Sequence, residues 1–275
     1  MVRPTAVLSA PPASPADAAR WQLVHDVTMK VDRQHFWHVI RNERIAGLIN
    51  RLIPTRNASY LEIGCGAANV IGYLFENGLR NCTGWDISPY ALETARNRYP
   101  QVQFELHDFL RDDPGQTRFD IVGSFDCLEH FPDEQAVLKG FYKLVKPGGY
   151  VILTVPAMRV LWSIYDEFFG HYKRYEKTEL QQRLSQAGFI NIQAAYMMAP
   201  LVPPLLLSRK TTSTSRYTKE DVKNMFRREG SLPNPLVNLC AKLVLRAEHS
   251  LFGMKDIGFG SALIAAAQRP VEPIE

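Results

Sequence analysis

The sequence predicts an α/β fold, in which a doubly wound, mostly parallel sheet of seven strands carries helices on both faces. The first observation is that short apolar runs alternate with helical segments from residue 59 to residue 198. The second is that a glycine-rich turn directly follows the first of these runs. Strand–helix alternation implies right-handed crossovers and therefore parallel pairing of neighbouring strands. In such sheets, ligands bind at the carboxyl ends of the strands, which is where this turn falls.

Each element follows from a local pattern. The runs that we expect to form strands are residues 59–64, 81–87, 102–108, 118–130, 150–156, 189–198 and 260–268, the fourth of which enters a loop. The expected helices are residues 17–51, 69–78, 88–99, 133–145 and 177–188. The helix at 88–99 begins with Ser88 as its N-cap and Pro89 at its first position, a combination that favours helix initiation.

The chain divides into four expected regions. Residues 1–16 are rich in proline, alanine and serine and are expected to form a disordered tail. Residues 17–56 form an N-terminal helical cap, and residues 57–198 with 257–275 form the core. Residues 199–256 are too many for a simple connection and are expected to form an inserted lid or accessory helical segment. Apolar residues recur there with helical spacing at Leu236, Leu239, Cys240, Leu243, Ala247 and Leu251.

Composition excludes several classes of protein. The 275 residues carry 46% hydrophobic side chains and a net charge of +4, values too ordinary to indicate disorder or a nucleic-acid partner. The longest apolar run, residues 196–207, is too short to span a bilayer and holds three prolines. The four cysteines form no CxxC pair or zinc-like cluster, so we expect no metal site and a reducing, cytoplasmic compartment. Carboxylates near an acceptor would still be able to recruit an ion.

The glycine-rich turn has the features of a nucleotide-type binding loop. Gly64 and Gly66 let the backbone turn sharply and approach a ligand. Asp86 ends the next strand, about 20 residues after the loop in the sequence, a spacing at which a carboxylate can bind ribose hydroxyls. Asp108 closes the third strand. No lysine follows the loop, which excludes a phosphate-binding P-loop. Glu62, directly before the loop, would repel a pyrophosphate and would suit a cationic ligand or one with an amino group.

The motifs together resemble one family. The runs "LEIGCGAANV", "GWDIS", "HDF", "FDIVGSFDCLEHF" and "LVKPGGYVILTVP", in this order, are similar to those of class I S-adenosylmethionine-dependent methyltransferases. The flanking runs "HFWHVIRNERI", "LWSIYDEFFGHYKRY" and "GFGSALIAAAQRP" resemble a bacterial methyltransferase-domain subgroup. The resemblance implies a Rossmann-like methyltransferase fold and S-adenosylmethionine as cofactor. Alanine at position 68, where many members have a third glycine, is a departure that we expect binding to tolerate.

The resemblance also implies a set of cofactor contacts. Glu62, Gly64, Cys65 and Gly66 would hold the methionine part, and Asp86 would bind the ribose. Ile87, Asp108 and Phe109 would lie beside the adenine, and Phe125, Asp126 and Cys127 would face the reactive end of the cofactor.

The upstream helix is expected to close over the cofactor. Trp37 and Arg41 lie one turn apart on the same face, where an aromatic ring and a guanidinium would cover the sulfonium and hold the carboxylate. The alternative is that Trp37 belongs to the core and Arg41 is a solvated surface charge.

Two histidines are candidates for a general base. His130 follows the fourth strand, and its alternative role is a hydrogen bond to the backbone. His171 lies in "FFGHYKRY", where Asp166 could orient it and Arg174 could bind an acidic group of the acceptor. Tyr175 completes this catalytic set.

We therefore expect methyl transfer to a small-molecule acceptor, favouring a hydroxyl or phenol. N- or C-methylation and a non-catalytic cofactor-binding module stay as alternatives. Seven Lys/Arg against two acids between Arg209 and Arg228, beside the apolar run, would suit a lipid-linked acceptor and peripheral contact with the inner membrane face. The alternative is a lid whose apolar residues pack on the domain. We expect a monomer or a homodimer.

Overall fold

The computed structural model describes residues 15–109, 111–112, 115–211, 219–229, 231–255 and 257–271. Residues 1–14 of the expected tail therefore lie outside the described residues, as do 212–218, 230 and 256 of the expected lid and 110, 113–114 and 272–275 of the expected core.

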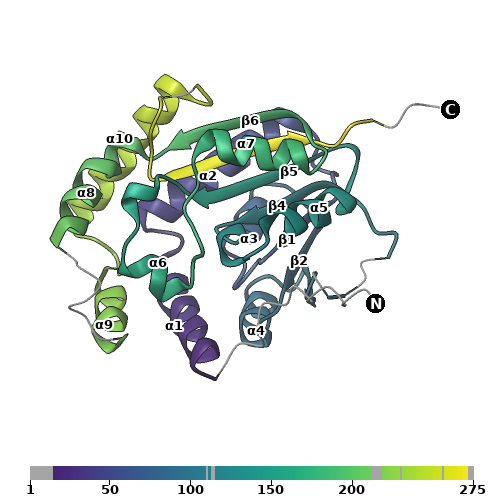
Figure 1. Ribbon diagram of the computed structural model, residues 1–275. Helices are drawn as coiled ribbons and strands as arrows, with labels where there is room; N and C mark the ends of the chain where they lie inside the picture. The colour runs from purple at the N-terminus through teal and green to yellow at the C-terminus, as the bar shows by residue number, and fades with distance from the viewer. Residues whose placement is uncertain are drawn as a thin grey trace, which may run out of the picture.

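The described strands form one mostly parallel sheet, which confirms the predicted fold class (Figure 1). The strands are β1 Tyr60–Ile63, β2 Cys82–Asp86, β3 Gln103–Leu106, β4 Phe119–Phe125, β5 Val145–Pro156, β6 Ile190–Met197 and β7 Ala262–Gln268. Their order is β3-β2-β1-β4-β5-β7-β6, and β7 runs antiparallel to both β5 and β6. The carboxyl ends of β1, β2 and β4 therefore meet at one edge of the sheet.

Helices cover both faces of this sheet. They include α3 Asn69–Glu76, α4 Pro89–Arg98, α5 Glu134–Leu144 and α7 Lys177–Gln186, whereas the short helix α6 Ile164–Phe169 contributes to neither apolar cluster. Buried side chains of α3 and α4 belong to one apolar cluster, and those of α5 and α7 to another on the opposite face. β1 lies between β2 and β4, and all four of its residues are buried. Since both faces of the strand are covered, its sequence does not alternate between apolar and exposed polar residues.

The N-terminal cap consists of two helices, where the sequence predicts one continuous helix. They are α1 Pro15–Val31 and α2 Phe36–Leu52. The expected tail was wrong at its end, because Pro15 and Ala16 belong to α1. The break is stabilised by His35, the N-cap of α2, whose side chain accepts a hydrogen bond from the backbone N–H of Trp37 at 3.2 Å.

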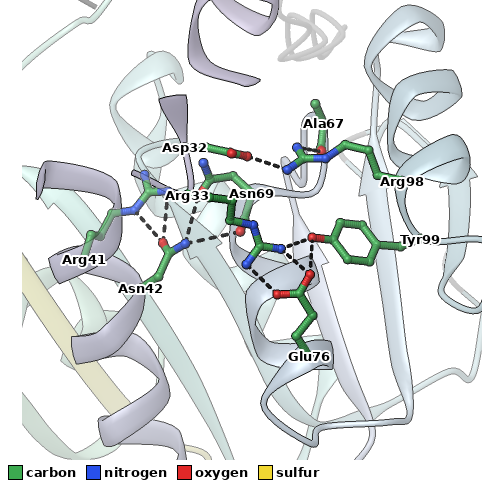
Figure 2. Close-up of polar contacts among 9 residues, drawn as sticks. All are labelled: Asp32, Arg33, Arg41, Asn42, Ala67, Asn69, Glu76, Arg98 and Tyr99. Carbon is green, nitrogen blue, oxygen red and sulfur yellow. Dashed lines mark hydrogen bonds and ion pairs between the residues drawn. The ribbon is translucent and has the colours of Figure 1, made fainter. Parts of the chain in front are cut away.

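Two ion pairs fix this break against the core, as Figure 2 shows. Asp32 accepts a 2.6 Å hydrogen bond from Arg98, which also donates to the carbonyl oxygen of Ala67 at 2.7 Å. Arg33 pairs with Glu76 of α3 at 2.7 Å. The cap is therefore attached to the helix and the loop that follow β1, next to the expected cofactor site.

The insert between β6 and β7 is helical. Its helices are α8 Val202–Thr211, α9 Lys219–Glu229 and α10 Pro235–Phe252. On its inner side, Glu248 of α10 forms a buried 2.8 Å ion pair with Arg44 of α2 and accepts hydrogen bonds from the backbone N–H groups of Met198 and Ala199. Since both charges are almost fully buried, we expect the pair to fix the position of α10.

The apolar stripe of α10 faces solvent. The helix itself is confirmed, but its stripe residues Leu236, Leu239, Leu243 and Leu251 are all more than half exposed. The alternative in which apolar residues of this region pack on the domain is confirmed for the run at residues 196–207, where Tyr196, Met197, Met198, Ala199 and Val202 are buried, but it is wrong for the stripe on α10. Among the described residues, none of the helices combines the length and apolarity that crossing a membrane requires.

Candidate functional site

The loop after β1 requires glycine at two positions. Gly64 and Gly66 have φ angles of +74° and +51°, in the left-handed region that disfavours side chains. A Cβ on Gly64 would also lie 2.7 Å from the sulfur of Cys127, and one on Gly66 would lie 3.1 Å from Cε1 of His25. Ala68 has a φ of 65° as well, so the residue that replaces a third glycine takes the glycine conformation.

Asp86 lies beside this loop at the end of β2. Its carboxylate accepts hydrogen bonds from the backbone N–H groups of Gly66 and Ser88, both at 2.8 Å. Burial raises the pKa of Asp86 above its ordinary value, which these hydrogen bonds partly offset. The next residue, Ile87, is 60% exposed and offers an apolar surface beside the acid.

Glu62 is buried at the end of β1. The hydroxyl of Tyr60 donates a 2.9 Å hydrogen bond to it, but burial dominates and raises the pKa of Glu62 to about 8. In the free protein, burial therefore favours the protonated form of this carboxyl group. A cationic group placed next to it would favour the carboxylate form.

Trp37 and Arg41 lie together as the sequence predicts. The guanidinium carbon of Arg41 lies 4.7 Å from the ring centre of Trp37. Arg41 is buried and donates hydrogen bonds to Asp126 and Asn69, so the alternative is wrong in making it a solvated surface charge. The other part of that alternative has support, because Trp37 packs against the apolar core. Asp126, at φ 50°, also accepts a 3.2 Å hydrogen bond from Thr154. That Arg41 binds the carboxylate of the cofactor stays a prediction.

The other expected cofactor residues differ in their surroundings. Phe125 is buried, and burial raises the pKa of Cys127 to about 12, so this thiol stays protonated. Cys65 is buried as well. Asp108 pairs with Arg111 at 3.4 Å, and Phe109 packs against Phe131 and Phe141, on the face of the sheet that α5 covers.

These groups fit S-adenosylmethionine. Two glycines with positive φ shape the loop after β1, a carboxyl group lies at or next to the end of each of the first two strands, and an exposed isoleucine follows the second. A ribose diol is recognised by a carboxylate, an ammonium group by a second one, and an adenine ring by an apolar side chain. That Asp86, Glu62 and Ile87 make these contacts stays a prediction.

The expected acceptor side contains an aspartate–histidine pair. Nδ1 of His171 lies 3.0 Å from Oδ1 of Asp166, as the sequence analysis proposes. The other ring nitrogen, Nε2, lies 3.9 Å from Oε1 of Glu129. Asp166 thus holds one side of the ring and leaves the other side turned towards Glu129.

His130 completes this cluster at the end of β4. Its ring centre lies 4.8 Å from that of His171, and burial lowers the pKa of His130 to about 3, with the charge of His171 as a further cause. His130 also makes a hydrogen bond with the backbone of Gly170, the role that the sequence analysis gives as its alternative. A ring that stays neutral over the physiological pH range is a poor proton carrier.

Two expected acceptor residues have other partners. Arg174 is buried and donates to Asp166 at 2.8 Å and to the carbonyl oxygen of Ala157 at 3.1 Å, so the expectation that it binds an acidic group of the acceptor does not match its contacts. Tyr175 is fully buried, and its hydroxyl donates to Glu134 at 2.9 Å. Tyr175 therefore has a structural position rather than a catalytic one.

Sequence reasoning missed three residues. Glu129 was quoted in its motif without a role, although it is 1% exposed and adjoins both histidines. Trp21 and His25 of α1 also cover the site, since Trp21 packs edge-on against His130 at 5.1 Å and His25 lies against Gly66. Trp21 and His25 could have been found from the sequence, because their spacing of four residues places them on one face of a helix.

The strand order, the glycine loop and the acids at the strand ends define a class I S-adenosylmethionine-dependent methyltransferase. A family model described as "Methyltransferase domain" matches residues 36–194. The chain belongs to this family, whose members use S-adenosylmethionine as methyl donor.

Two curated relatives illustrate the range of sequence similarity. Phosphoethanolamine N-methyltransferase 3 of Arabidopsis thaliana is 35% identical over 98 residues, which are 34% of this chain and 20% of the relative. A ubiquinone biosynthesis O-methyltransferase of Coxiella burnetii is 32% identical over 121 residues, which are 42% of this chain and 51% of the relative. The match thus spans only a fifth to a half of the length of these relatives.

Solved structures share the fold at low identity. The phosphoethanolamine N-methyltransferase 2 of Haemonchus contortus, in complex with S-adenosyl-L-methionine, has a TM-score of 0.55 and 19% identity, over 83% of this chain and 52% of that one. The plantazolicin methyltransferase BpumL, in complex with a monoazolic desmethylPZN analog and SAH, has a TM-score of 0.59 and 14% identity, over 93% of this chain and 91% of that one.

Proposed function

We propose that this chain transfers the methyl group of S-adenosylmethionine to a hydroxyl or phenol oxygen of a small-molecule acceptor. The observation that carries the proposal is the position of His171, which is held by Asp166 on one side and faces Glu129 on the other. The names of similar proteins include O- and N-methyltransferases, so likeness alone does not choose between oxygen and nitrogen. A positioned base suits an oxygen acceptor, because a hydroxyl must lose its proton to be a good nucleophile.

The proposed reaction is an in-line displacement. The cofactor supplies an activated methyl group on a sulfonium, so the protein mainly aligns and desolvates the reactants. The acceptor oxygen forms a bond to the methyl carbon, the carbon–sulfur bond breaks with its electron pair passing to sulfur, and the hydroxyl proton passes to Nε2 of His171. Asp166 stabilises the resulting imidazolium and holds the ring in one orientation.

Methyl transfer to a panel of acceptors tests this proposal. The panel contains a simple phenol, a prenylated phenol, an aliphatic alcohol and phosphoethanolamine, and transfer is followed with a labelled methyl donor. We expect label on a hydroxyl compound and a large loss of turnover in His171→Ala with unchanged S-adenosylhomocysteine affinity. His249→Ala, an exposed histidine on α10, is the matched control. Label on phosphoethanolamine alone would support N-methylation, and binding without any transfer would support a cofactor-binding module.

We further propose that the protein lies in the cytoplasm and contacts the inner membrane face through α10. An exposed apolar stripe on a helix is typical of peripheral attachment, and the basic stretch from Arg209 to Arg228 precedes this helix in the sequence. A lipid-linked or prenylated acceptor would be presented at such a surface. The support is the exposure of the stripe together with the excess of positive charge in the same insert.

A further inference from the structure

We propose that Glu129, His130 and His171 bind a divalent transition-metal ion of the zinc type at the acceptor side of the site. One ligand atom from each of these residues lies within 4.8 Å of the others. Glu129 and His130 form the short helix Leu128–His130 directly after β4, and His171 comes from the loop after α6. The three side chains therefore meet from two separate segments.

The buried carboxyl group of Glu129 lacks a hydrogen-bond partner among the described residues. Glu129 is 1% exposed, and within the described part of the chain neither of its carboxylate oxygens accepts a hydrogen bond from another residue. Arg174, which could otherwise balance this carboxyl group, is hydrogen-bonded to Asp166. An isolated buried carboxylate is costly, and buried charges in proteins are paired or coordinate metals. A divalent cation between Glu129 and the histidines would supply the missing partner.

Both histidines are oriented as metal ligands usually are. Nδ1 of His171 lies 3.0 Å from Asp166, and His130 makes a hydrogen bond with the backbone of Gly170. Metal-ligating histidines almost always use their second ring nitrogen in this way, with a carboxylate or a backbone carbonyl as acceptor. Each ring thus keeps one nitrogen for the ion.

The donor set selects the kind of ion. Two imidazoles and one carboxylate are the ligands of catalytic zinc sites, which keep a fourth position open, whereas Mg²⁺ prefers oxygen ligands. Nε2 of His171 and Oε1 of Glu129 are now 3.9 Å apart. Tetrahedral coordination at ordinary bond lengths would bring them to about 3.3 Å, a shift that side-chain rotation can provide.

This inference rests on the proposed function and changes the role of His171 within it. The acceptor hydroxyl would take the open position, where the ion lowers its pKa, and its proton would pass to water. Nε2 of His171 would then be a ligand rather than the proton acceptor. The sequence analysis expects no metal site because it finds no CxxC pair or zinc-like cluster, and His171 lies far from Glu129 and His130 in the sequence.

Metal binding to the full chain tests the proposal directly. Protein freed of metal with a chelator is dialysed to equilibrium against Zn²⁺ or Mg²⁺, and Co²⁺ is added separately to record its visible absorption. We expect one Zn²⁺ per chain, an intense tetrahedral Co²⁺ spectrum and no competition by excess Mg²⁺. Glu129→Gln and His171→Ala should weaken Zn²⁺ binding at least 100-fold, and Asp166→Asn about 10- to 100-fold. His249→Ala should bind as the wild type does.

The same samples are titrated with S-adenosylhomocysteine, which separates failure of this proposal from failure of the proposed function. Unchanged cofactor affinity in the variants shows that they are folded. Less than a tenth of an ion per wild-type chain, or equal Zn²⁺ binding by wild type and both ligand variants, would overturn the metal site while the methyltransferase proposal stands. Loss of cofactor binding by the wild type itself would instead contradict the proposed function.

Discussion

The carboxylate of Asp166 and the imidazole of His171 form a pair in which Oδ1 lies 3.0 Å from Nδ1. The same oxygen accepts a 2.8 Å hydrogen bond from Arg174, and Oδ2 accepts one from the backbone of Ser163 at the start of α6. Asp166 thus links the beginning of a helix, a buried arginine and a histidine at the acceptor site. Capping of α6 fixes the position of the Asp166 carboxylate, and that carboxylate in turn orients the ring of His171.

Asp166→Asn should therefore reduce both turnover and stability. The amide cannot balance the charge of buried Arg174, and breaking a buried pair costs about 3–5 kcal/mol. We expect a urea-unfolding free energy lower by about that amount and a fall in kcat, with unchanged affinity for S-adenosylhomocysteine. Asp133→Asn, which replaces the N-cap of α5, is the control for loss of a capping carboxylate. Equal kcat in wild type and Asp166→Asn would contradict the role of Asp166.

The stability contributed by Asp166 should also depend on pH. Burial acts to raise the pKa of Asp166. Hydrogen bonds and charges from His171 and Arg174 outweigh burial and hold this pKa below its ordinary value. A depressed pKa stabilises the folded state above the unfolded value and loses that contribution as pH falls through the folded one. Unfolding curves of the wild type should thus weaken below about pH 4 more than those of Asp166→Asn. Parallel curves would exclude this linkage.

The contribution of Glu62 to stability should depend on pH in the opposite direction. Because its folded pKa is about 8 against an ordinary 4.5, its stabilising contribution is complete below pH 4.5 and is lost as pH rises to 8. The free energy of unfolding of the free protein should fall by up to about 1.4 kcal/mol per pH unit in this window, and Glu62→Gln should remove that slope. If Glu62→Gln keeps the same slope of unfolding free energy against pH, the slope is caused by other groups.

Cofactor binding should release a proton from Glu62. An ammonium group beside the carboxyl favours its ionised form, so binding at pH 7 should displace the proton that the free protein holds there. Calorimetry of S-adenosylhomocysteine binding in buffers of different ionisation enthalpy measures this release. Glu62→Gln should release none from this position, and equal release by both proteins would show that Glu62 does not face the ligand.

Gly66→Ala should weaken cofactor binding beyond its effect on folding. The alanine adds backbone strain and places a methyl group 3.1 Å from His25, where the loop should meet the ligand. Gly115→Ala is a matched control, since Gly115 also has a positive φ, of 61°, but no atom within 4 Å of an added Cβ. Both should lose about 1 kcal/mol of stability through strain, and only Gly66→Ala should lose cofactor affinity. Equal affinities would place the ligand elsewhere.

The stripe on α10 should bind anionic membranes. Wild-type protein should sediment with vesicles containing phosphatidylglycerol, and the double variant Leu239→Glu, Leu243→Glu should not, because it places acids on the exposed face. Leu106→Glu alters another exposed leucine, at the far edge of the sheet, and should sediment normally. Absence of wild-type sedimentation would remove the membrane contact.

Much of the fold could be predicted because its signals are local. The buried run of β1, the Ser88 N-cap of α4 and the glycines after β1 each determine their own element. Periodicity in α10 predicts that the helix has an apolar face but not whether that face meets protein or solvent, and here it meets solvent. The break between α1 and α2 depends on Asp32 and Arg33 finding partners in α3 and α4, which no local pattern shows.

The acceptor site was less predictable for the same reason. His171 and Asp166 are close in the sequence, so their pairing was accessible. The approach of Glu129 to His171 depends on how the loop after α6 returns to the end of β4. Likewise, Arg174 could be recognised as important, but that its partner is Asp166 rather than an acceptor is a property of the folded chain.

The measurement that tests the central claim most directly is calorimetric titration with S-adenosylmethionine, S-adenosylhomocysteine and NAD. The account predicts one site per chain for both sulfur compounds, none for NAD, and a marked loss of affinity in Asp86→Asn, because the amide replaces the carboxylate at the end of β2 that we assign to the ribose. Binding of NAD without the sulfur compounds, or affinity for them that Asp86→Asn leaves unchanged, would contradict it.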